Sequence, residues 1–232
     1  MSSAVNSPSG DSSPVDGFTG MHRTQNLSQA ERAYLTLRDL ILSLRLSPGS
    51  PVQEEPLTKE LGIGRTPFRE AVKRLQAESL IAIYPRRGSF VTEVNITDHA
   101  LIADVRRQLE GHAAQRAAER VTEAERGELE ELRELVEALP GEQAPIMDVD
   151  TRVHRTVYRC THNGYLENTL GQYYNLAVRI WCLFFDRLPD VTDHVVEHGE
   201  LLKAVIEGDT ERADRIAVAH VDHFEHAIRQ VI

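Results

Sequence analysis

Residues 61–75 read LGIGRTPFREAVKRL, which is the pattern of a tight turn followed by a helix. Gly62 provides the permissive backbone of the turn, after a short helix that ends at Leu61. Thr66 predicts an N-cap, and Pro67 suits the first position of the next helix. The stretch therefore predicts the turn and second helix of a helix-turn-helix, which points to DNA.

The predicted second helix has an apolar and a polar face. Its apolar residues recur at helical spacing and are expected to pack inward. Its polar residues gather on the opposite side, where such a helix meets the base edges of the major groove. The inward residues are Phe68, Ala71, Val72 and Leu75, and the predicted DNA contacts are Arg65, Thr66, Arg69 and Lys73.

Two short strands and a basic turn follow this helix. Residues 81–84 and 89–92 have the composition of strands, and the sequence PRRG at 85–88 favours a turn between them. Paired arginines in a turn usually face solvent without a further role, but beside a recognition helix they are well placed to contact phosphates. A winged helix-turn-helix is therefore predicted. Its wing residues expected at DNA are Arg86, Arg87 and Gly88.

The distribution of charge agrees with this prediction. The chain of 232 residues has a formal net charge of −10, which is unusual for a DNA-binding protein. Residues 27–92, however, contain ten Lys and Arg against seven Asp and Glu, a charge of +3, whereas residues 93–232 carry −12 and residues 1–26 carry −1. The positive charge thus falls where DNA is expected to bind.

The cysteine content and the composition of the N-terminal segment narrow the class of protein further. The only two cysteines, Cys160 and Cys182, lie in apolar helical patterns, so buried reduced thiols are expected rather than a disulfide framework. Neither a signal peptide nor a membrane span is visible, which predicts a cytoplasmic protein with no membrane partner. Residues 1–26 are rich in Ser, Pro, Gly and Asp and are predicted to form a disordered leader.

Beyond Thr92 the chain has helical periodicity almost throughout. Caps and breakers divide it into six segments, which predict an antiparallel bundle. The predicted fold is therefore mainly α, with a winged helix-turn-helix over 27–92, a linker over 93–98 and an all-α bundle over 99–232. A supporting helix is expected over 27–46, with Ala30, Tyr34, Leu37, Ile41 and Leu44 on its inner side. The bundle segments begin at 97 or 98, 122, 145, 165, 191 and 210, and they end at 121, 139, 161, 188, 207 and the C-terminus.

Four polar residues of the predicted bundle are spaced to share one site. Asp150 and His154 lie four residues apart, on one face of a helix. His198 precedes a turn at Gly208 and His220 follows it at nearly the same separation, so at about 1.5 Å per residue both lie at one level of a helical hairpin. Both histidines also fall within apolar stripes and should point toward the core, where a buried imidazole needs a partner.

A divalent metal is one such partner. A lone histidine in an apolar stripe is more often a hydrogen-bonded core residue, but an aspartate and three histidines from three helices form a donor set for a metal. We predict zinc, with nickel or manganese as alternatives, and open coordination positions for water or a carboxylate. The alternative ligands, each within one helical turn of a chosen one, are His194, His223 and His226.

Three segments within residues 27–92 resemble the DNA-binding domain of the GntR family of bacterial transcription regulators. They read LSPG at 46–49, LGIGRTPFREA at 61–71 and RRGSFV at 86–91. Gly64 replaces the serine that is usual in the family. The loss of the hydroxyl is expected to weaken a helix cap or a phosphate contact without changing the fold. Glu55 stands where some members have an arginine that touches DNA, so no base contact is transferred to that position.

The rest of the chain resembles the FadR C-terminal domain, called FCD. The resemblance covers residues 150–168 and 198–220, together with the pattern of arginine, leucine, glutamate and alanines over 106–118. It implies a homodimer that binds a palindromic operator, most often as a repressor, and an organic-acid effector. It also implies metal ligands at the matching positions, which are Asp150 and His154 in an Asp-x-x-x-His motif, His198 in a Glu-His motif and His220 in an Ala-His motif.

Arg106 is the predicted effector contact, because a guanidinium aimed into the bundle binds a carboxylate through two hydrogen bonds. The resemblance implies the same role. The alternatives are a surface ion pair between Arg106 and Glu110, and a rotated helix in which Arg107 takes the place of Arg106. Asn168 is the second predicted effector contact. Further candidates for the lining of the cavity are Tyr158, Tyr173, Arg179 and Trp181.

These observations predict a regulator, not an enzyme, whose affinity for double-stranded operator DNA changes when the bundle binds a small carboxylate near a metal. The segment from Glu93 to Asp98 is the expected hinge. One alternative is a regulator in which the metal itself is structural or is the signal. The other is a metalloenzyme, in which aspartate and histidines activate water. The sequence has neither a convincing nucleophile pair nor a glycine-rich phosphate loop to support that second alternative.

Overall fold

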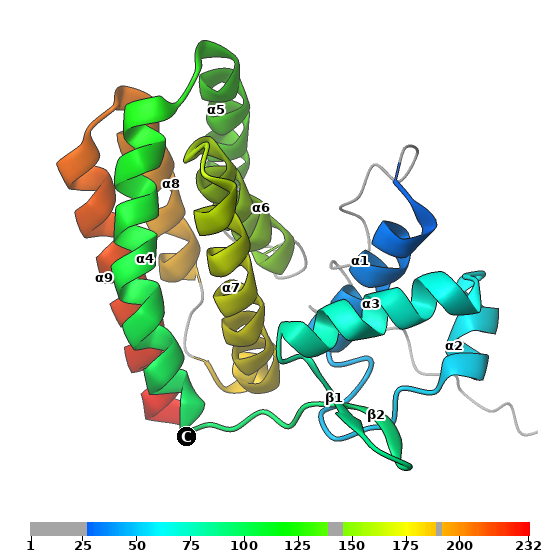
Figure 1. The fold of residues 1–232 in the computed structure, drawn as a ribbon. Helices are drawn as coiled ribbons and strands as arrows, with labels where there is room; N and C mark the ends of the chain where they lie inside the picture. The colour runs from blue at the N-terminus through cyan, green and yellow to red at the C-terminus, as the bar shows by residue number, and fades with distance from the viewer. Residues whose placement is uncertain (1–26, 139–145, 189–191) are drawn as a thin grey trace, which may run out of the picture.

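The computed structural model describes residues 27–138, 146–188 and 192–232. It shows two parts: an N-terminal region of three helices and a two-stranded sheet, and a bundle of helices α4 to α9 (Figure 1). An extended segment joins the end of the sheet to the start of α4. The mainly α fold with a small β wing is thus confirmed. The predicted leader 1–26 and the predicted helix stop at Leu139, Pro140 and Gly141 lie outside the described residues.

Helix α1 (Gln29–Leu42) supports the recognition helix. Ser28 caps it by accepting a hydrogen bond from the backbone N–H of Glu31, at 3.1 Å. Its buried residues pack against α3. The predicted extension to residue 46 is wrong, because the chain leaves the helix after Leu42. Leu44, expected on the inner side of the helix, instead adopts the left-handed conformation, with φ of 59°.

Helices α2 (Glu54–Leu61) and α3 (Arg65–Ala77) form the helix-turn-helix. Gly62 ends α2 with φ of 63°, as predicted for a permissive turn residue. The predicted N-cap at Thr66 is wrong: the cap of α3 is Gly64, and Thr66 and Pro67 are the second and third helical residues. A serine at position 64 would normally cap the N–H of either of these two residues, but Pro67 has none. The departure from the family serine therefore removes at most one cap bond.

The wing is an antiparallel pair of strands, β1 (Ile81–Tyr84) and β2 (Gly88–Val91), with Ile81 opposite Val91 and Tyr84 opposite Gly88. The second strand begins one residue earlier than predicted. A pairing that was not predicted extends the sheet, because residues 49–52 run along β2. The N–H of Gly49 donates to the carbonyl of Val91 at 3.0 Å, and the N–H of Val52 donates to the carbonyl of Ser89 at 2.8 Å.

The bundle begins with α4 (Asp98–Arg120), which packs along the last helix, α9 (Thr210–Val231). The two helices run in opposite directions, so the C-terminus lies beside the start of α4 (Figure 1). Helix α8 (Thr192–Glu207) packs against α9 and against α5 (Glu123–Glu137). The hairpin between α8 and α9 turns at Gly208, with φ of 75°.

Helices α6 (Ile146–Cys160) and α7 (Gly164–Phe184) complete the bundle, and α7 continues into a short 3₁₀ turn, η3 (Phe185–Arg187). Both cysteine thiols are free; Cys160 is buried and Cys182 is half-buried. None of the helices in the described ranges combines the length and the apolar character that a membrane crossing requires. The core of the bundle surrounds a group of buried polar residues.

Candidate metal centre and DNA-binding surface

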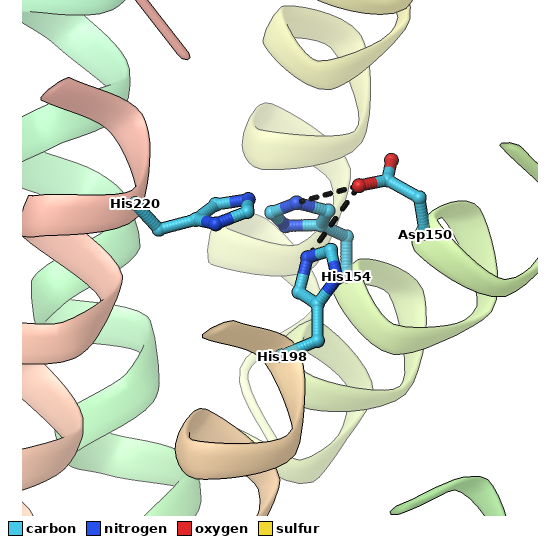
Figure 2. A group of neighbouring side chains, drawn as sticks. All are labelled: Asp150, His154, His198 and His220. Atoms are coloured by element: carbon cyan, nitrogen blue, oxygen red, sulfur yellow. Dashed lines mark ion pairs between the residues drawn. The ribbon is translucent and has the colours of Figure 1, made fainter. Parts of the chain in front are cut away.

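Four side chains from three helices meet inside the bundle (Figure 2). Asp150 and His154 come from α6, His198 from α8 and His220 from α9. Each offers a ligand atom, and these atoms all lie within 4.8 Å of one another. All four residues are buried, with 3% or less of their surface exposed. The structure thus brings together the four residues that the sequence pattern selected as metal ligands.

Several polar atoms of this group have no hydrogen-bond partner among the described residues. They are Oδ1 of Asp150 and both ring nitrogens of His198. Oδ1 of Asp150 lies 3.4 Å from Nε2 of His198 and 3.8 Å from Nε2 of His154. Leaving buried polar atoms without partners is unfavourable, and a cation bound between them would satisfy both the oxygen and a ring nitrogen. The donor set, one carboxylate and three imidazoles, therefore fits a divalent metal.

Polar contacts on the outer sides of two of the imidazoles, those of His154 and His220, orient their inner nitrogens. Nδ1 of His154 lies 3.2 Å from the hydroxyl of Tyr158 and 3.4 Å from Oε2 of Glu110. Nδ1 of His220 lies 2.9 Å from Oε2 of Glu197. Metal-binding histidines commonly contact a carboxylate in this way through the ring nitrogen that does not bind the metal.

Tyr174 fixes the aspartate itself. Its hydroxyl donates to Oδ2 of Asp150 at 2.5 Å, and it also lies 2.9 Å from the hydroxyl of Thr151. One oxygen of the carboxylate is thereby engaged, and the other, Oδ1, faces the histidines. Sequence reasoning missed Glu197 and Tyr174 in these roles.

Burial and charge set the protonation of the group. Burial lowers the pKa of His198 to about 3, and burial together with the neighbouring histidines holds the pKa of His220 well below its ordinary value. Burial opposes ionisation of Asp150, but the neighbouring imidazoles of His194, His154 and His198 outweigh it and hold the pKa of the carboxyl below its usual range. Neutral imidazoles and an ionised carboxylate are the forms that bind metal.

The alternative ligands differ in position. His223 and His226 are exposed on α9. His194 lies close to the group, because its Nε2 is 3.7 Å from Oδ1 of Asp150 and its ring stacks on that of His220, with the centroids 3.9 Å apart. It forms a second group of possible ligands with Glu197 and His220. His194 is therefore an additional donor at the edge of the site.

Arg106 points into the bundle and lies beside this group. It binds Oε1 of Glu110 through two nitrogens, at 2.6 and 3.0 Å, so the ion pair expected as an alternative does form. The pair is not on the surface, however, because both residues are only 4% exposed. Arg107 faces outward instead and binds Asp104 and Asp222.

A small cavity is lined by Arg106 and by three of the four proposed ligands. Its lining includes Arg106, Asp150, His154, Trp181 and His220. Its volume is only about 10 Å³. That space suits one ion or one water molecule, and an organic acid needs more.

The structure does not bring Asn168 to this cavity. Asn168 is exposed on α7 and lines a separate cleft between α7 and α1. Arg179, another candidate for the lining, contacts the end of the wing: it donates to the hydroxyl of Thr92 at 2.8 Å and to the carbonyl of Thr92 at 2.5 Å. Tyr158 and Trp181 are buried near the polar group, whereas Tyr173 is only half-buried.

The N-terminal region presents the basic residues that the sequence selected for DNA contact, and all of them are exposed. On α3, Arg69 donates to both oxygens of Glu54, and Arg65 lies 3.9 Å from the same carboxylate. The remaining exposed residues of this surface are Thr66 and Lys73 on α3 and Arg86, Arg87 and Gly88 at the turn of the wing.

Comparison with known proteins decides the family. Residues 29–91 match the family model described as bacterial regulatory proteins of the gntR family, and residues 101–223, more than half of the chain, match the FCD domain. This chain belongs to the GntR family. GntR proteins are transcription regulators, not enzymes, so this GntR protein is a DNA-binding transcription regulator.

Its relatives include proteins named as repressors. The transcriptional repressor RspR of Escherichia coli is 24% identical over 92% of this chain and 93% of its own length. The galactonate operon transcriptional repressor of Escherichia coli is 26% identical over 88% of this chain and 99% of its own length. The solved structure of E. coli McbR/YncC has the same fold, with a TM-score of 0.77, 22% identity, and coverage of 88% of this GntR chain and 98% of that chain.

Proposed function

We propose that this GntR regulator is a homodimeric repressor whose affinity for a palindromic operator changes when a small carboxylate binds beside a divalent metal in the bundle. The observation that supports it most is the convergence of Asp150, His154, His198 and His220, with an unpartnered carboxylate oxygen among them. The group lies in a domain joined directly to a DNA-binding domain. A regulator of this kind acts where the chromosome is, in the cytoplasm.

The proposed metal is zinc, with nickel or manganese as alternatives. Asp150, His154, His198 and His220 would hold it, and His194 is close enough to add a fifth donor. When bound, such an ion attracts the carboxylate of an organic acid as a Lewis acid. Glu110, Tyr158 and Glu197 would keep the imidazoles in the orientation that binds the ion.

Arg106 is the residue proposed to bind the effector carboxylate. Its guanidinium lines the small cavity, and its only ion pair in the described part of the chain is with Glu110. The effector carboxylate would accept two parallel hydrogen bonds from this guanidinium, which it would share with Glu110. The name of the galactonate operon repressor suggests sugar acids as the first compounds to test.

The size of the cavity connects effector binding to conformation. About 10 Å³ is too small for an organic acid, so the helices around the cavity must separate when one enters. A ligand that binds the widened bundle better than the closed one shifts the population toward the widened form. The wing and the recognition helix would then engage DNA differently.

The proposed DNA contacts are the exposed basic residues of α3 and the wing. In the dimer, two recognition helices would enter successive major grooves of the operator, which explains the expected palindrome. The arginines and the lysine would supply phosphate contacts and base contacts. The basic residues are Arg65, Arg69, Lys73, Arg86 and Arg87, and the exposed Thr66 and Gly88 complete the proposed DNA contacts.

The test begins with an operator selected from a pool of random duplexes by the zinc-loaded, full-length protein. DNA affinity is then measured by fluorescence anisotropy at fixed zinc, with galactonate and other sugar acids and with each acid's recovery checked by chromatography. A change in DNA affinity without consumption of the acid supports the proposal. A response to the metal alone would favour the alternative, a metal-responsive regulator.

Two variants locate the effector. Arg106→Gln is expected to weaken the acid's effect on DNA affinity at least about tenfold, because it removes a buried charge that would bind the carboxylate. Arg107→Gln is the matched control, since Arg107 faces outward on the same helix. If the acid changed DNA affinity equally in the two variants, the effector would not bind at Arg106 inside the bundle.

A further inference from the structure

A second cleft lies at the junction of the two domains. It has a volume of about 550 Å³, within the usual range of small-molecule sites. One wall comes from α1 and α3, which belong to the DNA-binding domain, and the other comes from α6 and α7 of the bundle. The proposed metal centre lies outside this cleft, because none of its four ligands lines it.

The wall on the DNA-binding side has its charges paired. Tyr34 donates to Glu78 at 2.9 Å, and the guanidinium of Arg74 lies over the Tyr34 ring, 3.5 Å from its centroid. Arg74 also donates to Glu31 at 2.8 Å. Arg38 in the same wall binds Asp39 at 2.7 Å.

The wall on the bundle side differs, because two of its polar groups lack partners among the described residues. Arg155 of α6 is half-buried, and no described carboxylate forms an ion pair with it. Asn175 of α7 is only 4% exposed, and its Oδ1 accepts no hydrogen bond. The unpartnered Oδ1 of Asn175 is unusual, since buried polar atoms normally have partners, whereas the half-buried guanidinium of Arg155 can also bind water.

The chemistry of these two groups defines a ligand. A guanidinium binds a carboxylate through two parallel hydrogen bonds, and an amide oxygen needs a hydroxyl or N–H donor. We propose that the cleft is a second ligand site, which takes a small hydroxycarboxylate through Arg155 and Asn175. The carboxylates of Glu31, Glu78 and Glu167 around the cleft disfavour larger polyanions.

The position of the cleft would give such a ligand influence over both domains. Arg155 directly follows His154 on α6, and Tyr158, which lines the cleft, also contacts His154. The opposite wall includes α1, which supports the recognition helix. A ligand in the cleft therefore stabilises one arrangement of the bundle relative to the DNA-binding domain. The site goes beyond the proposed effector at the metal and does not depend on it.

Malate and succinate are the probes, because they differ by one hydroxyl group. Binding to the full-length, zinc-loaded protein is measured by isothermal titration calorimetry. Malate is expected to bind, and succinate to bind several-fold more weakly, because only malate has a hydroxyl that can donate to Asn175. Arg155→Gln and Asn175→Ala are each expected to weaken malate binding at least about tenfold.

Two further variants identify the site. Arg152→Gln is the matched control, because Arg152 is exposed on the same helix and lies outside the cleft. His198→Ala removes a proposed metal ligand, and malate binding should survive it. Circular dichroism checks that each variant is folded, and if Arg155→Gln is not, Asn175→Ala decides.

Three outcomes would overturn the proposal. The first is malate affinity that stays unchanged in both Arg155→Gln and Asn175→Ala. The second is binding lost only in His198→Ala, which would assign malate to the metal centre instead. The third is no malate binding by the unmodified protein at about 10 mM, far weaker than a functional ligand requires.

Discussion

Arg69 of the recognition helix donates two hydrogen bonds to Glu54 of the preceding helix, at 2.8 and 3.0 Å. Hydrogen bonding and the charge of Arg69 lower the pKa of Glu54, so the carboxylate is ionised at neutral pH. The guanidinium proposed to contact DNA is therefore engaged within the protein before DNA arrives. DNA must compete with Glu54 for it.

Glu54→Gln should raise DNA affinity by up to about tenfold, because it removes both this competition and a negative charge beside the phosphates. Glu60→Gln is the control, since it makes the same charge change on α2 at an exposed position. Anisotropy titrations at several salt concentrations measure both. Weaker binding by Glu54→Gln would show instead that Glu54 positions Arg69 for DNA.

The proposed metal centre predicts the metal content of the purified, untagged protein. About one zinc ion per chain is expected by plasma mass spectrometry, and His198→Ala and His220→Ala should each lose it. His226→Ala should retain it, because His226 is exposed on the same helix as His220. Protein that stays metal-free after incubation with zinc, nickel or manganese would return these histidines to the role of core residues.

Two helical glycines should respond oppositely to the same substitution. A Cβ at Gly111 of α4 would meet the carboxylate of Asp214 and, at 2.8 Å, a methyl group of Val218, both on α9. Gly111→Leu should therefore destabilise the protein by about 1–3 kcal/mol. Nothing lies within 4 Å of such an atom at Gly127, so Gly127→Leu should stabilise α5 by about 0.5–1 kcal/mol. Urea denaturation measures both, and equal effects would contradict the close approach of α4 and α9.

The cap of α5 predicts a pH dependence. Partial burial raises the pKa of Glu125, but hydrogen bonds from Thr122 and His162 outweigh it and lower the pKa from 4.5 to about 2. Because the folded-state pKa is depressed, the ionised carboxylate stabilises the fold above about pH 4.5, and this stabilisation is lost as the pH falls toward 2. Glu125→Ala should cost about 1 kcal/mol at pH 7.

On this linkage, the difference in stability between the unmodified protein and Glu125→Ala should shrink as the pH falls from about 5 toward about 2, by roughly the size of the cap contribution. Glu123→Ala is the control, because its side chain is 98% exposed in the same helical turn. Thermal unfolding at several pH values provides the comparison. A difference that does not change with pH would exclude the charge of Glu125 as its cause.

Local signals predict most of the fold. Thr122 begins a helix as predicted, where the structure shows that it forms a capping box with Glu125, and Gly208 turns the last hairpin. Errors occur where distant contacts decide. Residues 49–52 pair with β2 through hydrogen bonds between residues about 40 positions apart, and no local pattern reveals such a pairing.

The residues of the candidate site can be predicted from the sequence only where the sequence reveals which face of each helix points inward. His198 and His220 lie in clear apolar stripes, so their inward direction follows from the sequence. Helix α7 has apolar residues on several sides, so its rotation does not follow from the sequence, and the structure places Asn168 at the cleft with α1 and not at the cavity beside Arg106. The contact of Glu197 with His220 depends on how α8 crosses α9, which neither helix alone determines.

The hydrogen bonds from Arg179 to Thr92 have a consequence for the rate of the proposed response to an effector. They attach the end of the wing to α7, while the chain itself attaches it to α4, so residues 93–97 are anchored at both ends. In the proposed mechanism, any turn of the DNA-binding domain would require this buried guanidinium to give up both bonds, which would impose an activation barrier. Two ligands with equal effects on operator affinity can then differ in the residence time of the protein on DNA, and hence in how soon transcription changes.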